Sequence, residues 1–471
     1  MMSAAPRDRI DRGTRVYGAL RGGRGVWPWI TAVAILYLAM QSVFFASTVA
    51  AVAIPNTRVV QQLDTGAEQR LWGTADYALD GVGHATETFS FAGVTDAFTE
   101  CIALTIGVPD NPDAQSNAVE SALRGRHLGT CSLAVPAIAA LAAGDHPAET
   151  FEYNRYWNGS VVVIRPLLAI GGVGMARLGV GLVFLGGLVT AVIALVRRVG
   201  GWAAAALMVP VLGTTNLVTQ PLNSMSHALS FGVMCFGIAV AVRLARETLP
   251  LLVAGAAVAG AVFNFVDYLL NPPMAWALFT FAAVAARWRA RQDLPLRNLW
   301  LTVAAGAAGW LGGYALTWVT RWGITVIAFG ESAWEEILGV ISNRMQGQYQ
   351  DLVVPGIGQP ILRNTGFWLT TIPTARWVAA ICLAVSLACV VWLVAKRRWR
   401  ALTVAVALTS PALLVVLWLE LLSNHSQIHM FFVYRSIPVA VGIVTAACVA
   451  VCTSLRVAAG AARSEFTEAA A

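Results

Sequence analysis

Two histidines four residues apart are the densest group of side chains in this 471-residue chain that could do chemistry. His425 and His429 belong to the run Asn-His-Ser-Gln-Ile-His at 424–429, and residues at that spacing share one face of a helix. Two such imidazoles can bind a metal ion or donate hydrogen bonds to a phosphate or sugar oxygen. No third protein ligand stands nearby, so we assign no metal ligands and leave a divalent cation open as a cofactor.

Two aspartates border apolar segments. Asp96 precedes the stretch 97–108, which we predict to be a short helix, so its carboxylate is either an N-terminal helix cap or a general base. Asp267 stands at the end of a longer apolar segment, and acids that border membrane spans are usually paired or functional. For Asp267 we therefore favour a functional role over a structural one.

Two arginines stand in apolar surroundings, where a cation needs an anionic partner. Arg165 follows the aromatic run 151–157, and Arg435 begins the last long apolar segment. A phosphate matches the planar guanidinium group, and a lipid headgroup without a catalytic role would match it equally. Gln220 opens a polar turn interrupted by Pro221, and such a turn either caps helices or lines a cavity.

The composition predicts that these residues are positioned by membrane helices. Hydrophobic residues make up 57% of the chain and charged residues 12%, whereas soluble proteins have about 25% charged residues. This excludes an ordinary soluble enzyme, a disordered protein and a disulfide-stapled secreted module. We predict an all-α integral membrane protein with about ten transmembrane helices, at 29–54, 175–196, 202–219, 227–245, 249–266, 273–287, 299–320, 377–395, 401–421 and 432–454.

Basic residues predict the orientation of these spans. They precede the first span and follow the even-numbered ones, and by the positive-inside rule those ends are cytoplasmic. We therefore expect a basic cytoplasmic N-terminus at 1–28, a membrane domain at 29–454 and a cytoplasmic tail at 455–471. The loops at 55–174 and 321–376 would be extracytoplasmic. Because the basic residues punctuate apolar segments, we expect no nucleic-acid partner.

The first outer loop carries two further features. Its apolar stretches near 133–143 and 161–171 are too short to span, so we predict interfacial or re-entrant segments. Cys101 and Cys131 could pair if the loop faces an oxidising compartment. The other five cysteines lie in apolar runs and are expected to be small core residues.

The order of these motifs resembles that of a widespread family of bacterial polytopic membrane proteins, whose architecture is similar to the GT-C superfamily of glycosyltransferases. The resemblance covers about 90–440. It is carried by Thr-Asp-Ala around Asp96, Tyr-Trp-x-Gly followed by Arg-Pro-Leu-Leu at Arg165, and Gln-Pro-Leu at Gln220. Further along stand Asp-Tyr-Leu-x-x-Pro at Asp267 and Asn-His-Ser-x-x-His-x-x-Phe-x-Tyr-Arg, which ends at Arg435.

The resemblance implies an enzyme of the bacterial plasma membrane that acts on the extracytoplasmic face. Its donor would be a polyprenyl-phosphate-linked sugar, decaprenyl-phosphate arabinofuranose being one candidate, and its acceptor a cell-envelope glycan or lipid. Asp96 would be the catalytic base of an inverting transfer. The substrate-binding residues would be Arg165, Gln220, Asp267, Tyr268, His425, His429, Tyr434 and Arg435.

Three other functions remain open from the sequence. A lipid or glycan transporter or flippase would show polar residues or broken helices at mid-membrane. A cell-envelope acyltransferase would need a thioester or lipid acyl donor and a base within reach, and the outer histidines do not exclude it. If the protein were a scaffold for an envelope complex, Asp267 and Arg435 would have no functional role.

Overall fold

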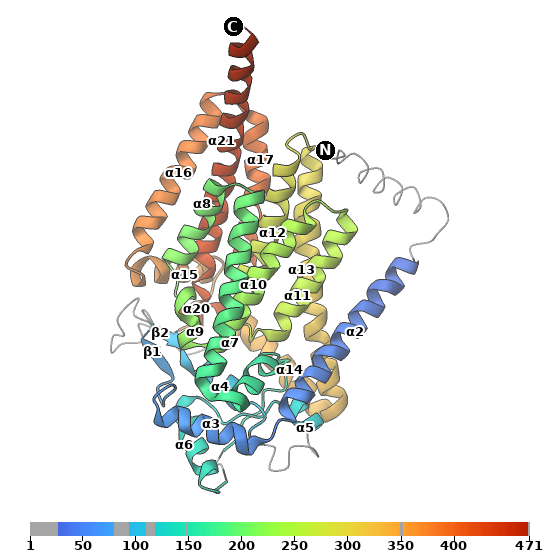
Figure 1. Ribbon diagram of the computed structural model, residues 1–471, viewed down its shortest axis with the longest axis vertical. Helices are drawn as coiled ribbons and strands as arrows, with labels where there is room; N and C mark the ends of the chain where they lie inside the picture. Colours follow the sequence, from blue (N-terminus) through green and yellow to red (C-terminus); the bar gives the residue numbers. More distant parts are fainter. Residues whose placement is uncertain (1–26, 80–93, 110–117, 147–148, 349–351, 470–471) are drawn as a thin grey trace. The chain divides into compact units, whose positions relative to one another are not determined.

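The computed structural model describes residues 27–79, 94–109, 118–146, 149–348 and 352–469 (Figure 1). Among these residues, eight helices are long and apolar enough to cross a membrane, or nine if one bent pair counts as a span. The expected all-α multi-pass membrane fold is confirmed at this level. Most of the basic segment at 1–28 lies outside the described residues.

The chain divides into two units at Ala46. The described part of the first unit is a single stretch of apolar helix, residues 27–46 of α2 (Trp27–Val52). Everything below concerns the second unit, from Ser47 onward.

The long helices of the second unit coincide with the apolar segments expected from the sequence. They are α7 (Val161–Arg198), α8 (Gly201–Gly213), α10 (Met225–Leu244), α11 (Leu249–Val266), α12 (Pro272–Ala290), α13 (Leu296–Phe329), α16 (Ala375–Ala395), α17 (Trp399–Thr409), α18 (Ala412–Leu421) and α21 (Ser436–Ala469). Large apolar side chains on their outer faces are exposed, such as Leu182 on α7 and Leu383 on α16. Exposed apolar surface on this scale is expected where lipid covers the protein.

Helix α12 differs from the other long helices because protein surrounds it. Every residue from Pro272 to Ala286 is buried, and α12 packs against α10, α11, α13, α18 and α21 (Figure 1). It is not one of the eight helices that qualify as spans by length and composition. A helix that is apolar on all sides belongs in a core, and α12 forms the centre of this one.

The remaining elements of the loop at 55–174 gather at one end of the bundle (Figure 1). They are α3 (Asn56–Glu68), the antiparallel strands β1 (Tyr77–Leu79) and β2 (Val94–Asp96), α4 (Ala97–Thr105), α5 (Ala118–Arg124) and α6 (Cys131–Ala142). A disulfide between Cys101 and Cys131 joins α4 to α6, with the two Cα atoms 5.1 Å apart. The loop expected at 321–376 contains α14 (Glu331–Gln346) and α15 (Gln359–Thr371).

Helix α7 contains a break at Gly171 and Gly172, where the backbone leaves the helical conformation. Gly172 has a φ of +70°, and a Cβ there would lie 2.5 Å from the Gln62 Oε1 atom of α3. Glycine therefore fits both the left-handed backbone and the close approach of α3. The stretch near 161–171, one of the two that we expected to be interfacial or re-entrant, is the short helical segment before this break.

A second break separates α8 from α9 (Gln220–Asn223), which follows the 3-10 turn η1 (Leu217–Thr219). The two parts are bent by 66°. Between them, Thr214 and Thr215 turn their hydroxyl groups back onto the carbonyls of Pro210 and Val211, a local bond that competes with helix continuation. The bend leaves the buried Asn216 inside the bundle.

Candidate functional site

The turn after α11 holds Asp267. The helix ends because Asp267 adopts an extended conformation, and its Oδ2 atom then accepts a hydrogen bond from the Leu270 N–H at 3.1 Å. The residue is 4% exposed. Burial raises the pKa of the Asp267 carboxyl to about 7, although N–H groups of the turn partly offset the effect. This carboxyl can therefore gain or lose a proton near neutral pH.

The same turn connects Asp267 to the histidine pair. Leu269 has a φ of +64°, and its carbonyl accepts a hydrogen bond from His425 Nε2 at 2.9 Å. His425 lies in α19 (Ser423–Ile428), and His429 follows that helix directly. The two rings lie 4.7 Å apart between centroids, which confirms that the pair shares one surface.

Arg344 of α14 joins the two histidines. Its Nη1 atom lies 3.2 Å from His425 Nδ1 and 2.7 Å from His429 Nε2. His425 therefore carries its proton on Nε2 and accepts from Arg344 with Nδ1. Burial, together with the neighbouring His429 and Arg344, lowers the pKa of His425 well below its usual value. The histidines thus position a guanidinium group by accepting its hydrogen bonds.

An apolar cavity of about 250 Å³ lies beside Arg344. Aromatic rings of α13, including Tyr314, Trp318 and Trp322, form one wall, and Ile337 and Ile341 of α14 belong to another. Arg344 and one further cation, Arg155, also line the cavity, as does Leu269 from the Asp267 turn. The cavity is therefore almost wholly apolar, with Arg155 and Arg344 among the residues that line it.

Arg155 is held by aromatic stacking. Its guanidinium lies 4.7 Å from the ring centroid of Tyr153 and 5.3 Å from that of Tyr156. Glu336 is 3.8 Å away, a long ion pair, and the Arg155 side chain is 19% exposed. Among the described residues, its buried Nε atom has no hydrogen-bond partner. The guanidinium also hydrogen-bonds the Tyr156 side chain, so its buried Nε atom is the donor left unused among the described residues.

Two buried polar side chains of the Asp267 turn also have atoms without hydrogen-bond partners within the described part of the chain. Neither side-chain atom of Asn271 makes a hydrogen bond, although the residue is 1% exposed, and the Oδ1 atom of Asp267 accepts none. Buried groups of this kind are rare and call for an explanation such as a ligand or a water molecule. Tyr268 is different, because its hydroxyl is 2.5 Å from that of Ser160.

Arg435 and Gln220 belong to a second cluster at the α8–α9 break. Arg435 Nε donates to Asn216 Oδ1 at 2.7 Å, and Gln220 Nε2 donates to the Asn216 carbonyl at 3.1 Å. Arg435 Nη1 lies 2.9 Å from His227 Nδ1. The ring of Phe432 packs against the rings of His227, His425 and His429, so it separates this cluster from the histidine pair.

Arg165 has a different environment from the one expected of a phosphate ligand. Its guanidinium donates to the carbonyls of Ile106 and Ile54 and to Asn56 Oδ1, and the residue is 1% exposed. Arg165 therefore ties α7 to the first outer loop. Tyr434 is also a packing residue, with its ring 5.3 Å from that of Phe367.

Asp96 is the last residue of β2, and its backbone is paired with that of Tyr77. Its side chain lies outside the described part of the structure. Strand β2 packs against α9 and against α20 (Met430–Val433), the short helix that follows His429. Strand β2, which ends at Asp96, therefore contacts the short segment between His429 and Arg435.

Sequence reasoning missed Arg344 and Arg155 as site residues. Arg344 lies on α14, where Trp334, Ile337 and Ile341 form the apolar stripe of an amphipathic helix. That periodicity was a usable signal. Among the described residues, no group of three or more His, Cys, Asp or Glu side chains could hold a metal ion.

Comparisons with protein-family models, with curated proteins and with solved structures find no match for this chain. The geometry of the cavity and its two arginines is therefore the basis for a functional assignment.

Proposed function

We propose that this protein is a glycosyltransferase of the bacterial plasma membrane that moves a sugar from a polyprenyl-phosphate donor to a cell-envelope glycan or lipid. In this proposal the chain has ten spans in a GT-C-like arrangement and cytoplasmic termini. The cavity then faces the extracytoplasmic side. The observation that supports the proposal is an apolar, aromatic cavity whose lining includes Arg155 and Arg344 and, from the buried Asp267 turn, Leu269.

The cavity matches the two halves of a lipid-linked phosphate. Isoprene units are apolar and would pack against the rings of Tyr314, Trp318 and Trp322. The phosphate would bind Arg155 and Arg344, whose planar groups can each form two hydrogen bonds with it. These two arginines replace Arg165 and Arg435 as phosphate ligands in the proposal, because they line the cavity whereas Arg165 and Arg435 do not.

The reaction would be a single displacement at the anomeric carbon. The acceptor oxygen loses its proton to a base and bonds to that carbon, while the bond to the phosphate oxygen breaks. The electron pair leaves with the phosphate, and the arginines stabilise the added charge. Asp96 is the proposed base. Asp267 and Asn271 have unpartnered buried atoms in the turn that reaches the cavity through Leu269, and they would orient the sugar hydroxyls.

The proposal is tested with purified protein in liposomes that contain radiolabelled decaprenyl-phosphate arabinofuranose, or other decaprenyl-phosphate sugars, and acceptor membranes. The measurement is the release of decaprenyl phosphate and the label transferred to the acceptor. We expect Arg344→Met to reduce kcat/KM by about 100-fold or more. Arg58→Met, which removes an exposed arginine of α3, is the matched control and should leave the rate unchanged.

Asp96→Asn separates the base from donor binding. We expect this variant to lose transfer while it still binds the labelled donor. Full transfer by Asp96→Asn would refute the base assignment, and equal rates for Arg344→Met and Arg58→Met would refute the phosphate site.

A flippase is the second candidate, and the 66° break between α8 and α9 favours it. Broken helices with buried polar groups are typical of transporter binding sites, and Asn216, His227 and Arg435 lie at this one. The same liposomes distinguish the two functions. Movement of a fluorescent decaprenyl phosphate between leaflets, without any release of sugar from the donor, would support a flippase and refute a glycosyltransferase.

A further inference from the structure

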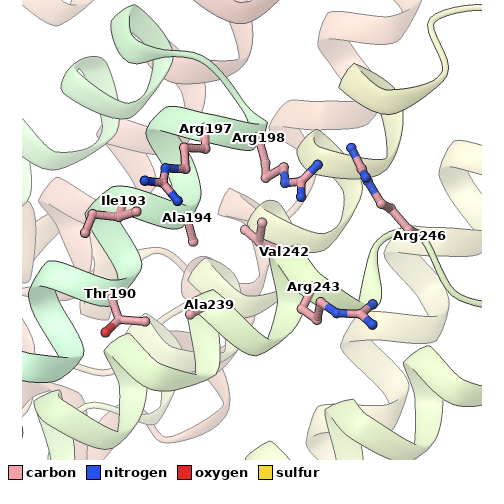
Figure 2. Close-up of a pocket in the computed structure, with 9 residues that line it drawn as sticks. All are labelled: Thr190, Ile193, Ala194, Arg197, Arg198, Ala239, Val242, Arg243 and Arg246. Carbon is pink, nitrogen blue, oxygen red and sulfur yellow. The ribbon is translucent and has the colours of Figure 1, made fainter. Parts of the chain in front are cut away.

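A second cavity, of about 320 Å³, lies at the far end of α7 (Figure 2). After its break at Gly171 and Gly172, helix α7 continues for 26 residues to Arg198, which is roughly 40 Å of helix at 1.5 Å per residue. The cavity is formed where α7 and α10 end. It is therefore far from the histidine pair and from the proposed donor site.

Four arginines line this cavity: Arg197 and Arg198 on α7, and Arg243 and Arg246 at the end of α10. Arg243 makes an ion pair with Glu247, with Nη1 and Oε1 2.6 Å apart. The other three make no side-chain hydrogen bond or ion pair within the described residues. Figure 2 shows Arg198, at the end of α7, and Arg246, in the turn after α10, extended toward one another. Such an arrangement of like charges is unfavourable without an anion between them.

Arginines near helix C-termini also offset the helix dipole. That effect acts on each helix separately and does not require the arginines of two helices to line one cavity. Four guanidinium groups against a single carboxylate leave an excess of positive charge in the cavity. The excess fits a ligand that carries more than one negative charge.

Apart from Thr190, the other residues that line the cavity are apolar. They are Ile193 and Ala194 of α7 and Ala239 and Val242 of α10 (Figure 2). Ile193 is 44% exposed, and the neighbouring Val240 is 43% exposed. Guanidinium groups above an exposed apolar wall match the headgroup and the first acyl carbons of a phospholipid. A soluble anion would use the arginines alone.

We propose that this cavity binds the headgroup of an anionic phospholipid, with preference for a headgroup that has two phosphates, as in cardiolipin. Basic pockets between membrane helices on the cytoplasmic side bind such headgroups. The positive-inside rule places these arginines on the cytoplasmic side. The proposal does not depend on the glycosyltransferase assignment, because it concerns the opposite end of the bundle.

The test is a lipid titration of the purified full-length protein in detergent, followed by native mass spectrometry. The probes are cardiolipin, phosphatidylglycerol and phosphatidylcholine. We expect the wild type to bind cardiolipin most tightly and phosphatidylcholine least. The triple variant Arg197→Gln, Arg198→Gln and Arg246→Gln should bind cardiolipin at least about 10-fold more weakly.

A matched triple variant controls for loss of surface charge: Arg291→Gln, Arg297→Gln and Arg398→Gln remove exposed arginines at the same end of the bundle. We expect its cardiolipin affinity to equal that of the wild type. Equal affinities for the two triple variants would overturn the proposal. Displacement of cardiolipin by inorganic phosphate alone would also overturn it in favour of a soluble anion.

Folding is checked by thermal unfolding of both triple variants in detergent without added lipid. If the pocket variant does not fold, Arg198→Gln alone provides the test, with an expected loss of about threefold in cardiolipin affinity. An unchanged affinity of a folded Arg198→Gln variant would likewise contradict the proposal.

Discussion

Replacement of Asp267 by asparagine tests the buried turn at the proposed site. Asparagine has the same shape, and its side-chain oxygen can still accept the hydrogen bond from the Leu270 N–H. It cannot ionise. Burial raises the pKa of Asp267 from 3.8 to about 7 in the folded protein, so between these values the folded state holds a proton that the unfolded chain releases.

The sign and size of the effect follow from this difference. Because the folded state binds the extra proton, the free energy of unfolding of the wild type falls as the pH rises from about 4 to about 7. The full loss is about 4 kcal/mol, at about 1.4 kcal/mol for each pKa unit. About 2.5 kcal/mol of this lies between pH 5 and pH 8. Asp267→Asn should lack this pH dependence.

The assay is reversible unfolding in detergent micelles at pH 5, 6.5 and 8, with the wild type compared with Asp267→Asn at each pH. His425, whose pKa is lowered, makes both proteins less stable as the pH falls below its usual value, and that contribution cancels in the difference. Asp293→Asn, at an exposed aspartate, is the control. A stability difference that stays constant from pH 5 to pH 8 would refute the raised pKa.

Three further predictions concern the outer elements. Replacement of Cys101 and Cys131 by serine should lower the free energy of unfolding by about 3 to 4 kcal/mol, because the disulfide closes a separation of 30 residues. An unchanged melting temperature under reducing conditions would contradict this. Arg165→Met should lower the free energy of unfolding by about 3 kcal/mol, since buried oxygens lose their donors. Lost donor binding in a fully stable Arg165→Met protein would instead favour a phosphate role. Gly172→Ala should cost about 1 to 2 kcal/mol because of its left-handed backbone, whereas Gly174→Ala, with open space around it, should cost less, as measured by thermal unfolding.

The fold could be anticipated from the sequence to a large extent, because long apolar runs leave few alternatives to membrane helices. The sequence is a poorer guide where contacts between distant segments determine what surrounds a helix. Segment 273–287 was expected to be a span from its apolar content, and the structure shows α12 enclosed by other helices. The apolar pattern alone does not distinguish lipid from protein as the surrounding medium.

The candidate site was anticipated only in part. The spacing of His425 and His429 placed both on one surface, since that depends on local helix geometry. Arg165 and Arg344 show why the rest was not accessible. Both are arginines near apolar residues in the sequence. Arg165 donates its hydrogen bonds to carbonyl groups of a distant loop, whereas Arg344 lines a cavity. Which oxygen a guanidinium meets depends on packing between segments far apart in the chain.

The enclosure of α12 has a consequence for how the chain enters the bilayer. A segment that leaves the translocon alone is stable in lipid only if its own side chains are apolar enough. Helix α12 is not among the helices that are apolar enough, by length and composition, to cross a membrane. Two of the helices that cover it, α18 and α21, are synthesised more than a hundred residues later. We therefore expect α12 to be retained beside the translocon with α10 and α11 until its later partners arrive, so truncation before α18 should leave it poorly inserted.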